Sequence, residues 1–276
     1  MRSVLFAAAA VCTAACSAAV AAERPVALSD APPLRVIEDR LSVEIGILPA
    51  SISTDARVDQ TAATPGTPFN AEDDFGLDDS RVLPTPEITF RPGQRHLFRL
   101  SSLVIRRDGT AVLERDIVYD EDEFEEGDIV DSMLDLNLIG ITYGYEILRK
   151  VDYSLAATFG IQVVEVKTNA VERGQGLRQP SGELAPVPAL GIEGRYFFYP
   201  QWSVEARVQY FKVSQDQLEG TFFDGRIAVT WQVNPHLGVG LGYRSFDLDA
   251  ESFDDNSSGL VNMTVQAPLI FARASF

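Results

Sequence analysis

The segment from Trp202 to Tyr210 reads Trp-Ser-Val-Glu-Ala-Arg-Val-Gln-Tyr, so apolar and polar residues alternate along it. Successive side chains of a β-strand point to opposite faces, and this segment would therefore have one apolar and one polar face. On a helix the same residues would be spread around the axis. The segment 223–233 repeats the alternation. Together the two segments predict neighbouring strands of one sheet.

The same alternation runs through most of the chain. It marks about ten segments: 41–47, 87–91, 96–104, 141–147, 153–162, 190–198, 202–210, 223–233, 237–244 and 261–276. Short turns containing Pro, Gly or charged residues connect some of them, at 91–95, 148–151, 199–201 and 234–236. The other connections are mostly long, at 53–83, 107–131, 169–183 and 248–259, with a brief one at 215–220.

Short turns at one rim and long loops at the other are typical of an antiparallel up-and-down barrel. The sequence therefore predicts an all-β fold of this kind, with about ten strands and with eight as the alternative.

The N-terminal residues have the features of an export signal. Arg2 is followed by a short apolar run, and small residues precede a cleavage site near Ala22. We expect three parts: a signal peptide at 1–22, an extended periplasmic leader at 23–38, and an outer-membrane barrel with long acidic outer loops at 39–276. Both cysteines, Cys12 and Cys16, lie in the signal, so the mature chain would have no thiol. Lipidation at Cys16 is the alternative.

The charge balance limits the partners. The 276 residues include 23 Lys and Arg against 40 Asp and Glu, a net charge of -17. Nucleic-acid binding needs a basic surface, so nucleic acid is excluded as a partner.

Alternation alone leaves open which face of the strands lies inside the barrel. In a soluble barrel the apolar set would face inward, and in a membrane barrel it would face lipid. In the second case the polar face would form an interior charge network, in which each charge needs a partner because a buried unpaired charge is costly. The network would consist of Glu44, Glu87, Arg91, Arg99, Glu146, Glu193, Arg195, Glu205, Arg207, Asp224, Arg226 and Arg244.

Two observations favour the lipid-facing orientation. Arg is the only cation in this set, as expected where carboxylates are paired through two hydrogen bonds in a confined space. Aromatic residues also gather at strand ends beside the short turns and would form a belt at one membrane interface. The belt residues are Tyr145, Tyr153, Tyr196, Phe198, Tyr199, Trp202 and Trp231.

With these features the chain resembles the small outer-membrane β-barrel proteins of Gram-negative bacteria. Its C-terminal segment 272–276 ends in Phe276, which is similar to the assembly signal of that family. The resemblance implies localisation in the outer membrane, with outer-membrane lipids, lipopolysaccharide and the outer-membrane assembly machinery as partners. The apolar parity changes near Pro268, where we expect a bulge or an unpaired site, and between Leu138 and Ile139, where we expect a second bulge.

Catalytic residues are scarce. The only histidines, His96 and His236, lie at predicted short turns on the periplasmic rim, so a hydrolytic site on the outer rim has no histidine base. We predict no enzymatic activity and no cofactor. The acidic run 120–128 in a predicted outer loop could supply carboxylates to divalent cations, but it lacks the fixed spacing of a calcium loop.

Three functions are compatible with these features. The first is a structural or interaction barrel of the outer membrane with a charge-plugged interior. The second is a narrow channel or binding barrel for a small, cationic solute, because side chains nearly fill a ten-stranded barrel and an open pore is disfavoured. The third is a soluble periplasmic barrel that carries an apolar ligand.

Overall fold

The computed structural model describes residues 39–59, 65–119, 122–173, 181–215, 218–254 and 257–276. The predicted signal peptide and leader lie outside the described residues. All regular structure in the described part is β-strand: β1 Leu41–Val58, β2 Phe69–Asn70, β3 Ser80–Phe90, β4 His96–Val112, β5 Ile117–Tyr119, β6 Asp122–Phe124, β7 Ile129–Arg149, β8 Tyr153–Glu172, β9 Ser181–Tyr199, β10 Trp202–Gln215, β11 Leu218–Asn234, β12 Leu237–Asp254 and β13 Ser257–Ser275. No helix of the described residues is long and apolar enough to cross a membrane.

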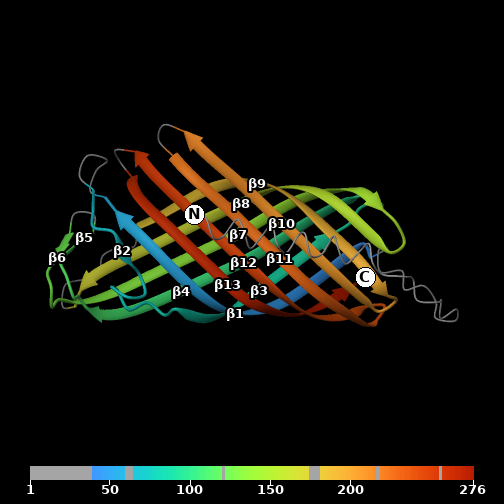
Figure 1. Cartoon of the computed structure of the whole chain (residues 1–276), viewed down its shortest axis with the longest axis horizontal. Helices are drawn as coiled ribbons and strands as arrows, with labels where there is room; N and C mark the ends of the chain where they lie inside the picture. Colours follow the sequence, from blue (N-terminus) through green and yellow to red (C-terminus); the bar gives the residue numbers. More distant parts are fainter. Residues whose placement is uncertain (1–38, 60–64, 120–121, 174–180, 216–217, 255–256) are drawn as a thin grey trace. The chain divides into compact units, whose positions relative to one another are not determined.

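Ten long strands form a closed antiparallel barrel (Figure 1). Each pairs with its neighbours in chain order, and β13 pairs with β1 to close the barrel. The short strand β2 pairs with the upper part of β1, and β5 pairs with β6 in a separate hairpin. The predicted all-β fold with ten barrel strands is confirmed, and the alternative of eight strands is wrong.

The two ends of the barrel differ less in loop length than predicted. The short turns lie at one end, which we call the short-turn end. At the opposite, long-loop end several predicted loops are strand: β12 continues to Asp254, for example, and β13 begins at Ser257. Residues 107–112, which we expected in a loop, belong to β4 and pair with β7. The strands are therefore considerably longer than the apolar alternation indicated.

The outer face of the barrel is apolar in the half nearer the short-turn end, called the lower or membrane-level half below. The half nearer the long-loop end is called the upper half. Ile141 and Leu241, on the outer face, have exposed fractions of 60% and 63%. Arg226, which points into the lumen, has an exposed fraction of 6%. Such a belt of exposed apolar side chains around a polar interior is the arrangement of a transmembrane barrel. The alternative of a soluble barrel with an apolar interior at this level is therefore wrong.

The two faces exchange their character toward the long-loop end. On β7, Ile139 and Ile141 point outward, but Leu134, Leu136 and Leu138 point inward and are buried. The ladders to β4 and β8 run through this point without a shift, so the predicted bulge at residues 138 and 139 is wrong. The change of parity marks instead the level at which the outer face begins to meet water rather than lipid, and we call it the exchange level.

The same explanation holds for the C-terminal strand. Leu269 and Phe271 face the lumen, and the register between β12 and β13 continues through Pro268 without a shift. A bulge at this position is therefore wrong, whereas the expected alternative, an unpaired site, agrees with the missing β1–β13 pairing around Pro268.

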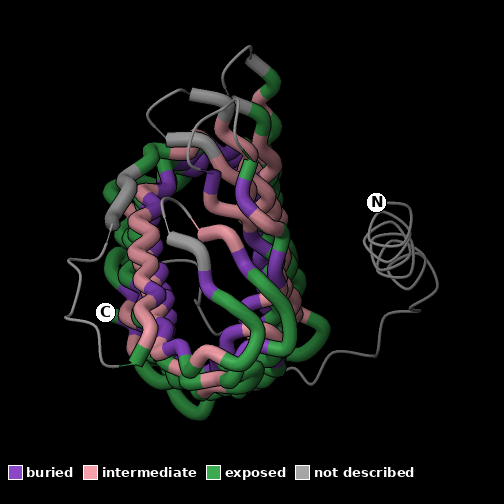
Figure 2. Tube along the Cα trace, turned by 90° about the vertical axis from the view of Figure 1, so that its left-hand side faces the viewer, coloured by how far each residue is buried: buried purple, intermediate pink, exposed green. Residues whose placement is uncertain are grey.

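Above the exchange level the lumen is a dry apolar core. Figure 2 looks toward the barrel from the long-loop end, with buried residues in purple. The core includes side chains from most strands and from the segment 69–77, which follows β1 and is called the inner segment below. Within that segment, Phe75 and Leu77 have exposed fractions of only 2% and 6%. The upper barrel thus has the apolar interior and polar exterior of a soluble protein.

Prolines coincide with three interruptions of the barrel wall. The pairing is missing in the middle of the β1–β13 seam, along the upper part of β9 beside β10, and along the upper part of β3 beside β4. Proline has no N–H to donate to a ladder, which explains the coincidence. The prolines at the three places are Pro49 and Pro268, Pro186 and Pro188, and Pro84 and Pro86.

Candidate functional site: the charged lumen

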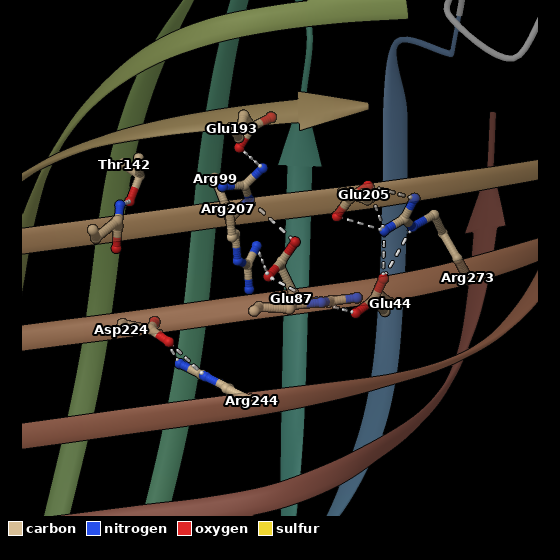
Figure 3. A network of polar contacts seen from close by, with 12 residues as sticks. Glu44, Glu87, Arg99, Thr142, Glu193, Glu205, Arg207, Asp224, Arg244 and Arg273 are labelled. Carbon is tan, nitrogen blue, oxygen red and sulfur yellow. Dashed lines mark hydrogen bonds and ion pairs between the residues drawn. The ribbon is translucent and has the colours of Figure 1, made fainter. Parts of the chain in front are cut away.

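The lumen of the membrane-level half of the barrel is lined by charged side chains from inward positions of the strands (Figure 3). Period-two alternation brings them there, because every second residue of a strand points inward. Of the twelve predicted network residues, eleven lie on barrel strands and Arg91 follows β3. Most are buried, and the structure brings many of them within ion-pair distance of one another.

Glu87 on β3 lies at the centre of the network. Its two carboxylate oxygens contact different arginines, with Arg99 Nε at 3.1 Å and Arg207 Nη1 at 2.7 Å. Arg99 also donates from Nη2 to Glu193 at 2.6 Å. A single carboxylate therefore connects β3, β4 and β10 across the lumen.

A second group lies around Glu44 and Glu205. Arg226 Nη1 lies 2.7 Å from Glu44 Oε1, and Arg273 donates from Nη2 to Glu44 Oε2 at 2.7 Å. Arg273 also contacts Glu205 at 3.3 Å, and Glu205 accepts a hydrogen bond from Arg195 at 2.5 Å. These contacts connect the first strand with the last.

Arg273 was missing from the predicted network. Its segment, 272–276, was interpreted only through Phe276, the C-terminal aromatic residue. Its parity could have identified it, because Arg273 shares the inward face with Ser275 and Phe271. The guanidinium of Arg273 lies 5.5 Å from the centre of the Phe271 ring, and that of Arg226 lies 4.7 Å from it. The aromatic face therefore supports two cations in the lumen.

Polar contacts extend toward the exchange level. Arg244 donates two parallel hydrogen bonds to Asp224, both at 2.9 Å. Beside this pair Gln162 donates to Gln209, which donates to Thr142, each at 3.1 Å. These are the last polar contacts below the apolar core.

Arginines outnumber carboxylates in the described lumen at this level. The paired carboxylates are Glu44, Glu87, Glu193, Glu205 and Asp224, and the arginines around them are Arg99, Arg195, Arg207, Arg226, Arg244 and Arg273. Sequence parity had suggested equal numbers of both signs. The structure shows one surplus positive charge in this group, because Arg273 also faces inward.

The remaining predicted network residues lie near the short-turn end. Glu146 contacts Arg149 at 3.3 Å and is not ion-paired with the central group. Arg91 makes no ion pair with a described residue. Arg91, Glu146 and Arg195 line a cavity of about 10 Å³, which is room for one water molecule.

The seven predicted belt residues lie on the outer face or at the turns of the short-turn end, with exposed fractions between 39% and 54%. The rings of Trp202 and Trp231 stack with centroids 6.1 Å apart. Phe90, Phe98 and Tyr143 are further exposed aromatic residues on the outer face near this end, which the sequence analysis did not include.

Phe276 lies where the two chain ends of the barrel meet. Its backbone N–H donates to the Leu41 carbonyl at 2.8 Å, and its carbonyl accepts from Arg40 at 2.9 Å. Its side chain has an exposed fraction of 66%.

Both histidines lie at the short-turn end. His96 begins β4, with Nδ1 2.8 Å from the Tyr143 hydroxyl, and His236 lies in the turn between β11 and β12, with Nδ1 3.0 Å from the Ser275 carbonyl oxygen. Within the described ranges no group of three His, Cys, Asp or Glu residues could hold a metal ion. Asp120 and Glu121 of the acidic run lie outside the described residues.

A separate set of ion pairs fixes the inner segment within the upper barrel. Arg107 on β4 is fully buried, contacts Glu72 and donates to Thr54 Oγ1 at 2.6 Å. Arg115 donates to Asp74 at 2.8 Å. Burial alone would raise the pKa of Asp74, but hydrogen bonds from Arg115 and the backbone lower it below its usual range. Arg107 was not predicted as a buried residue, because apolar alternation ends before it and places it in a loop.

No protein-family model and no curated protein sequence matches the chain. Among solved structures, the outer membrane protease OmpT from Escherichia coli matches with a TM-score of 0.55 and 10% sequence identity, over 86% of this chain and 96% of that one. Ail, the attachment invasion locus protein of Yersinia pestis, matches in its complex with the heparin analogue sucrose octasulfate, with a TM-score of 0.36, 11% identity and coverage of 84% and 99%. The Pseudomonas putida toluene transporter TodX matches with a TM-score of 0.35, 10% identity and coverage of 89% and 93%. At these identities the likeness concerns the fold alone, and that fold is the closed transmembrane β-barrel of Gram-negative outer membranes.

Proposed function

We propose that the chain is an integral outer-membrane barrel of structural or interaction type, whose closed lumen passes no solute. The observation that carries the proposal is the filling of the lumen by two different means. Ion-paired side chains fill the membrane-level half, and apolar side chains together with the inner segment fill the upper half. A solute would have to cross both.

The charged side chains that fill the membrane-level half resist opening because each is ion-paired with others. Separating Glu87 from Arg99 and Arg207 would leave a buried carboxylate and two buried cations without partners. Such a loss is strongly unfavourable in a confined, poorly hydrated interior. The surplus of arginine also opposes a path for cations, which was the solute class expected for a narrow channel.

The upper filling resists opening because the inner segment is anchored at several points. Its backbone accepts a hydrogen bond from Ser132 at the Phe75 carbonyl, 2.9 Å, and forms an isolated bridge between Leu77 and Gly109. The buried contact between Arg107 and Glu72 adds a charged anchor. This filling needs no ligand to stay closed.

If the lumen is closed, the protein must act through contacts made by its outer surface. Above the exchange level the wall is polar, with residues such as Asp135, Asn137 and Lys167 on its outer face. We propose that this raised wall contacts lipopolysaccharide or other molecules outside the cell, and that the aromatic belt sits at the periplasmic interface. Phe276 would serve recognition by the outer-membrane assembly machinery. The proposal involves no catalytic step, since both histidines lie at the opposite, short-turn end.

Planar-bilayer recording tests the closed lumen. We expect refolded protein to insert without steady unitary currents. The comparison is a variant in which a flexible Gly/Ser linker replaces residues 69–77. This variant should show transient currents more often, because the apolar filling of the upper half is loosened. Steady unitary currents from the unmodified protein would overturn the proposal and favour the narrow channel.

A further inference from the structure

The wall between β3 and β4 contains a break that is closed above and below. The two strands pair only over Glu87–Phe90 on β3 and Phe98–Ser101 on β4. Nearer the long-loop end, Leu77 of the inner segment, which precedes β3, forms an isolated bridge with Gly109 of β4. Between these two contacts, residues 78–86 and 102–108 have no ladder with each other. The break is therefore a bounded gap in the backbone pairing of the wall, called the opening below, across which Arg81 lies 3.8 Å from Asp108.

Pro84 and Pro86 account for the break. The ladder between β3 and β1 continues through both prolines, with Pro84 opposite Ile47 and Pro86 opposite Ile45. An uninterrupted ladder on that side means that the missing N–H groups are those that would have faced β4. The sequence Pro-Thr-Pro thus removes two successive donors from one edge of β3.

A cavity lies at the lower end of the break, between outward-facing and inward-facing residues of the two strands. It is lined by Pro86 and Ser102 from outward positions, and by Thr85 and Ser101 from inward positions. Its inner side is formed by three buried arginines, Arg207, Arg226 and Arg244, and by Glu87, one oxygen of which lies 3.8 Å from Arg226 Nη1. The volume is about 10 Å³, enough for one water-sized atom.

One of these arginines has unused donors. The side chain of Arg226 is 3% exposed, and only its Nη1 reaches a carboxylate, at 2.7 Å from Glu44. Its Nε and Nη2 are buried and have no hydrogen-bond partner among the described residues. Buried donors without a partner are rare and call for an explanation such as a bound ion or ligand. The surplus positive charge of the lumen points to an anion.

The position of the opening indicates where such an anion would come from. Beside the break, Ile45 and Ile47 on β1 and Ile139 on β7 belong to the exposed apolar belt. Farther along the same strands the outer face becomes polar, at Ser51 and Asn137. The opening therefore faces the upper edge of the membrane, where the head groups of outer-leaflet amphiphiles lie.

We propose that this opening is a binding site for the phosphate head group of an outer-leaflet amphiphile. One anionic phosphate oxygen enters the cavity and accepts hydrogen bonds from Arg226, while the rest of the head group stays at the outer mouth beside Ser102. Guanidinium groups and hydroxyls are the usual partners of phosphate oxygens. The acyl chains remain in the membrane against the apolar belt. The site lies in the wall, so it is independent of whether the lumen conducts.

Titration with dodecyl phosphate tests the site. The protein is refolded in dodecyl maltoside micelles, and binding is followed by ³¹P NMR. We expect one saturable site per barrel for dodecyl phosphate and at least tenfold weaker binding of inorganic phosphate. Ser102→Phe should block the mouth without touching the ion pairs and should weaken binding at least tenfold. Ser51→Phe, on the outer face of β1 away from the cavity, is the matched control and should bind as the unmodified protein does.

Arg226→Lys tests the donors themselves, because lysine keeps the positive charge but lacks the planar group that carries Nε and Nη2. We expect at least a tenfold loss of affinity. Absence of saturable binding to the unmodified protein, or full binding by folded Ser102→Phe, would overturn the proposal. Equal affinity for inorganic phosphate would overturn the membrane source of the ligand. If Arg226→Lys fails to refold, the two serine variants still decide the outcome.

Discussion

Glu44 on the first strand and Arg273 on the last lie directly opposite each other in the seam that closes the barrel, and two Arg273 nitrogens donate to one Glu44 oxygen at 3.0 and 2.7 Å. The residues are 229 positions apart in the chain. Higher in the same seam, the ladder is interrupted where Pro49 and Pro268 occur. The ion pair thus reinforces a seam that lacks some of its backbone hydrogen bonds.

Removing one member of this pair should destabilise the barrel. We expect Glu44→Gln or Arg273→Gln to lower the free energy of unfolding by about 3–5 kcal/mol, since each removes one partner from a buried charge of the network. The double variant should lose less than the sum of the two. Urea titration in detergent micelles, read from the gel mobility of unboiled samples, measures the change. Lys167→Gln, which breaks a half-exposed pair on the outer wall, is the control and should have little effect. Equal losses in all three single variants would contradict this prediction.

The exchange of faces along β7 predicts different responses from two apolar residues of one strand. Leu136 is fully buried in the upper core, whereas Ile141 faces lipid. Leu136→Ala should lower the free energy of unfolding by about 2–5 kcal/mol because it leaves a cavity. Ile141→Ala should cost less, since lipid fills the space. The same urea titration compares them, and a larger loss for Ile141→Ala would mean that the faces are assigned wrongly.

Gly109 lets the inner segment lie flat against β4. A Cβ at this position would meet the Gly76 carbonyl oxygen, and would lie 2.8 Å from the Leu77 backbone nitrogen. Both contacts are with backbone and cannot be relieved by a side-chain rotation. Gly109→Ala should therefore displace the inner segment and increase cleavage by chymotrypsin near Phe75. Gly93→Ala, where a Cβ meets nothing within 4 Å, is the control and should leave cleavage unchanged. A protected inner segment in Gly109→Ala would contradict the close approach.

Acid should loosen the inner segment. Hydrogen bonds from Arg115 and the backbone overcome the effect of burial and keep the pKa of Asp74 below its usual range. A carboxylate with a lowered pKa in the folded state stabilises that state above its unfolded pKa of about 3.9, and the contribution is lost as the pH falls through the folded value. We expect cleavage by pepsin within residues 65–79 to increase only below about pH 4. Without Arg115 the folded and unfolded pKa values of Asp74 come closer together, so Arg115→Gln should weaken the acid dependence and raise cleavage above pH 4 as well. An unchanged profile in that variant would show that this ion pair does not hold the segment.

The polar lining of the lumen was largely predictable from the sequence. Inward positions follow from strict alternation, and eleven of the twelve predicted network residues lie on strands of the barrel. Which carboxylate meets which arginine was not predictable, because partners such as Arg99 and Glu193 are 94 residues apart and come together only through strand register and tilt. Arg273 was overlooked although its parity was visible. The buried contact of Arg107 with Glu72 was hidden by the assumption that apolar alternation ends where the strand ends.

The architecture follows from the amino-acid sequence, since a period of two is a local property of each strand and Pro and Gly mark the turns between strands. The charged face of the membrane-level barrel follows from it too. The level at which inside and outside exchange their polarity does not, because it depends on where all ten strands together leave the membrane. The return of residues 69–77 into the lumen and the opening beside Pro84 and Pro86 are likewise decided by the tertiary structure. Both depend on contacts between strands that no single segment encodes.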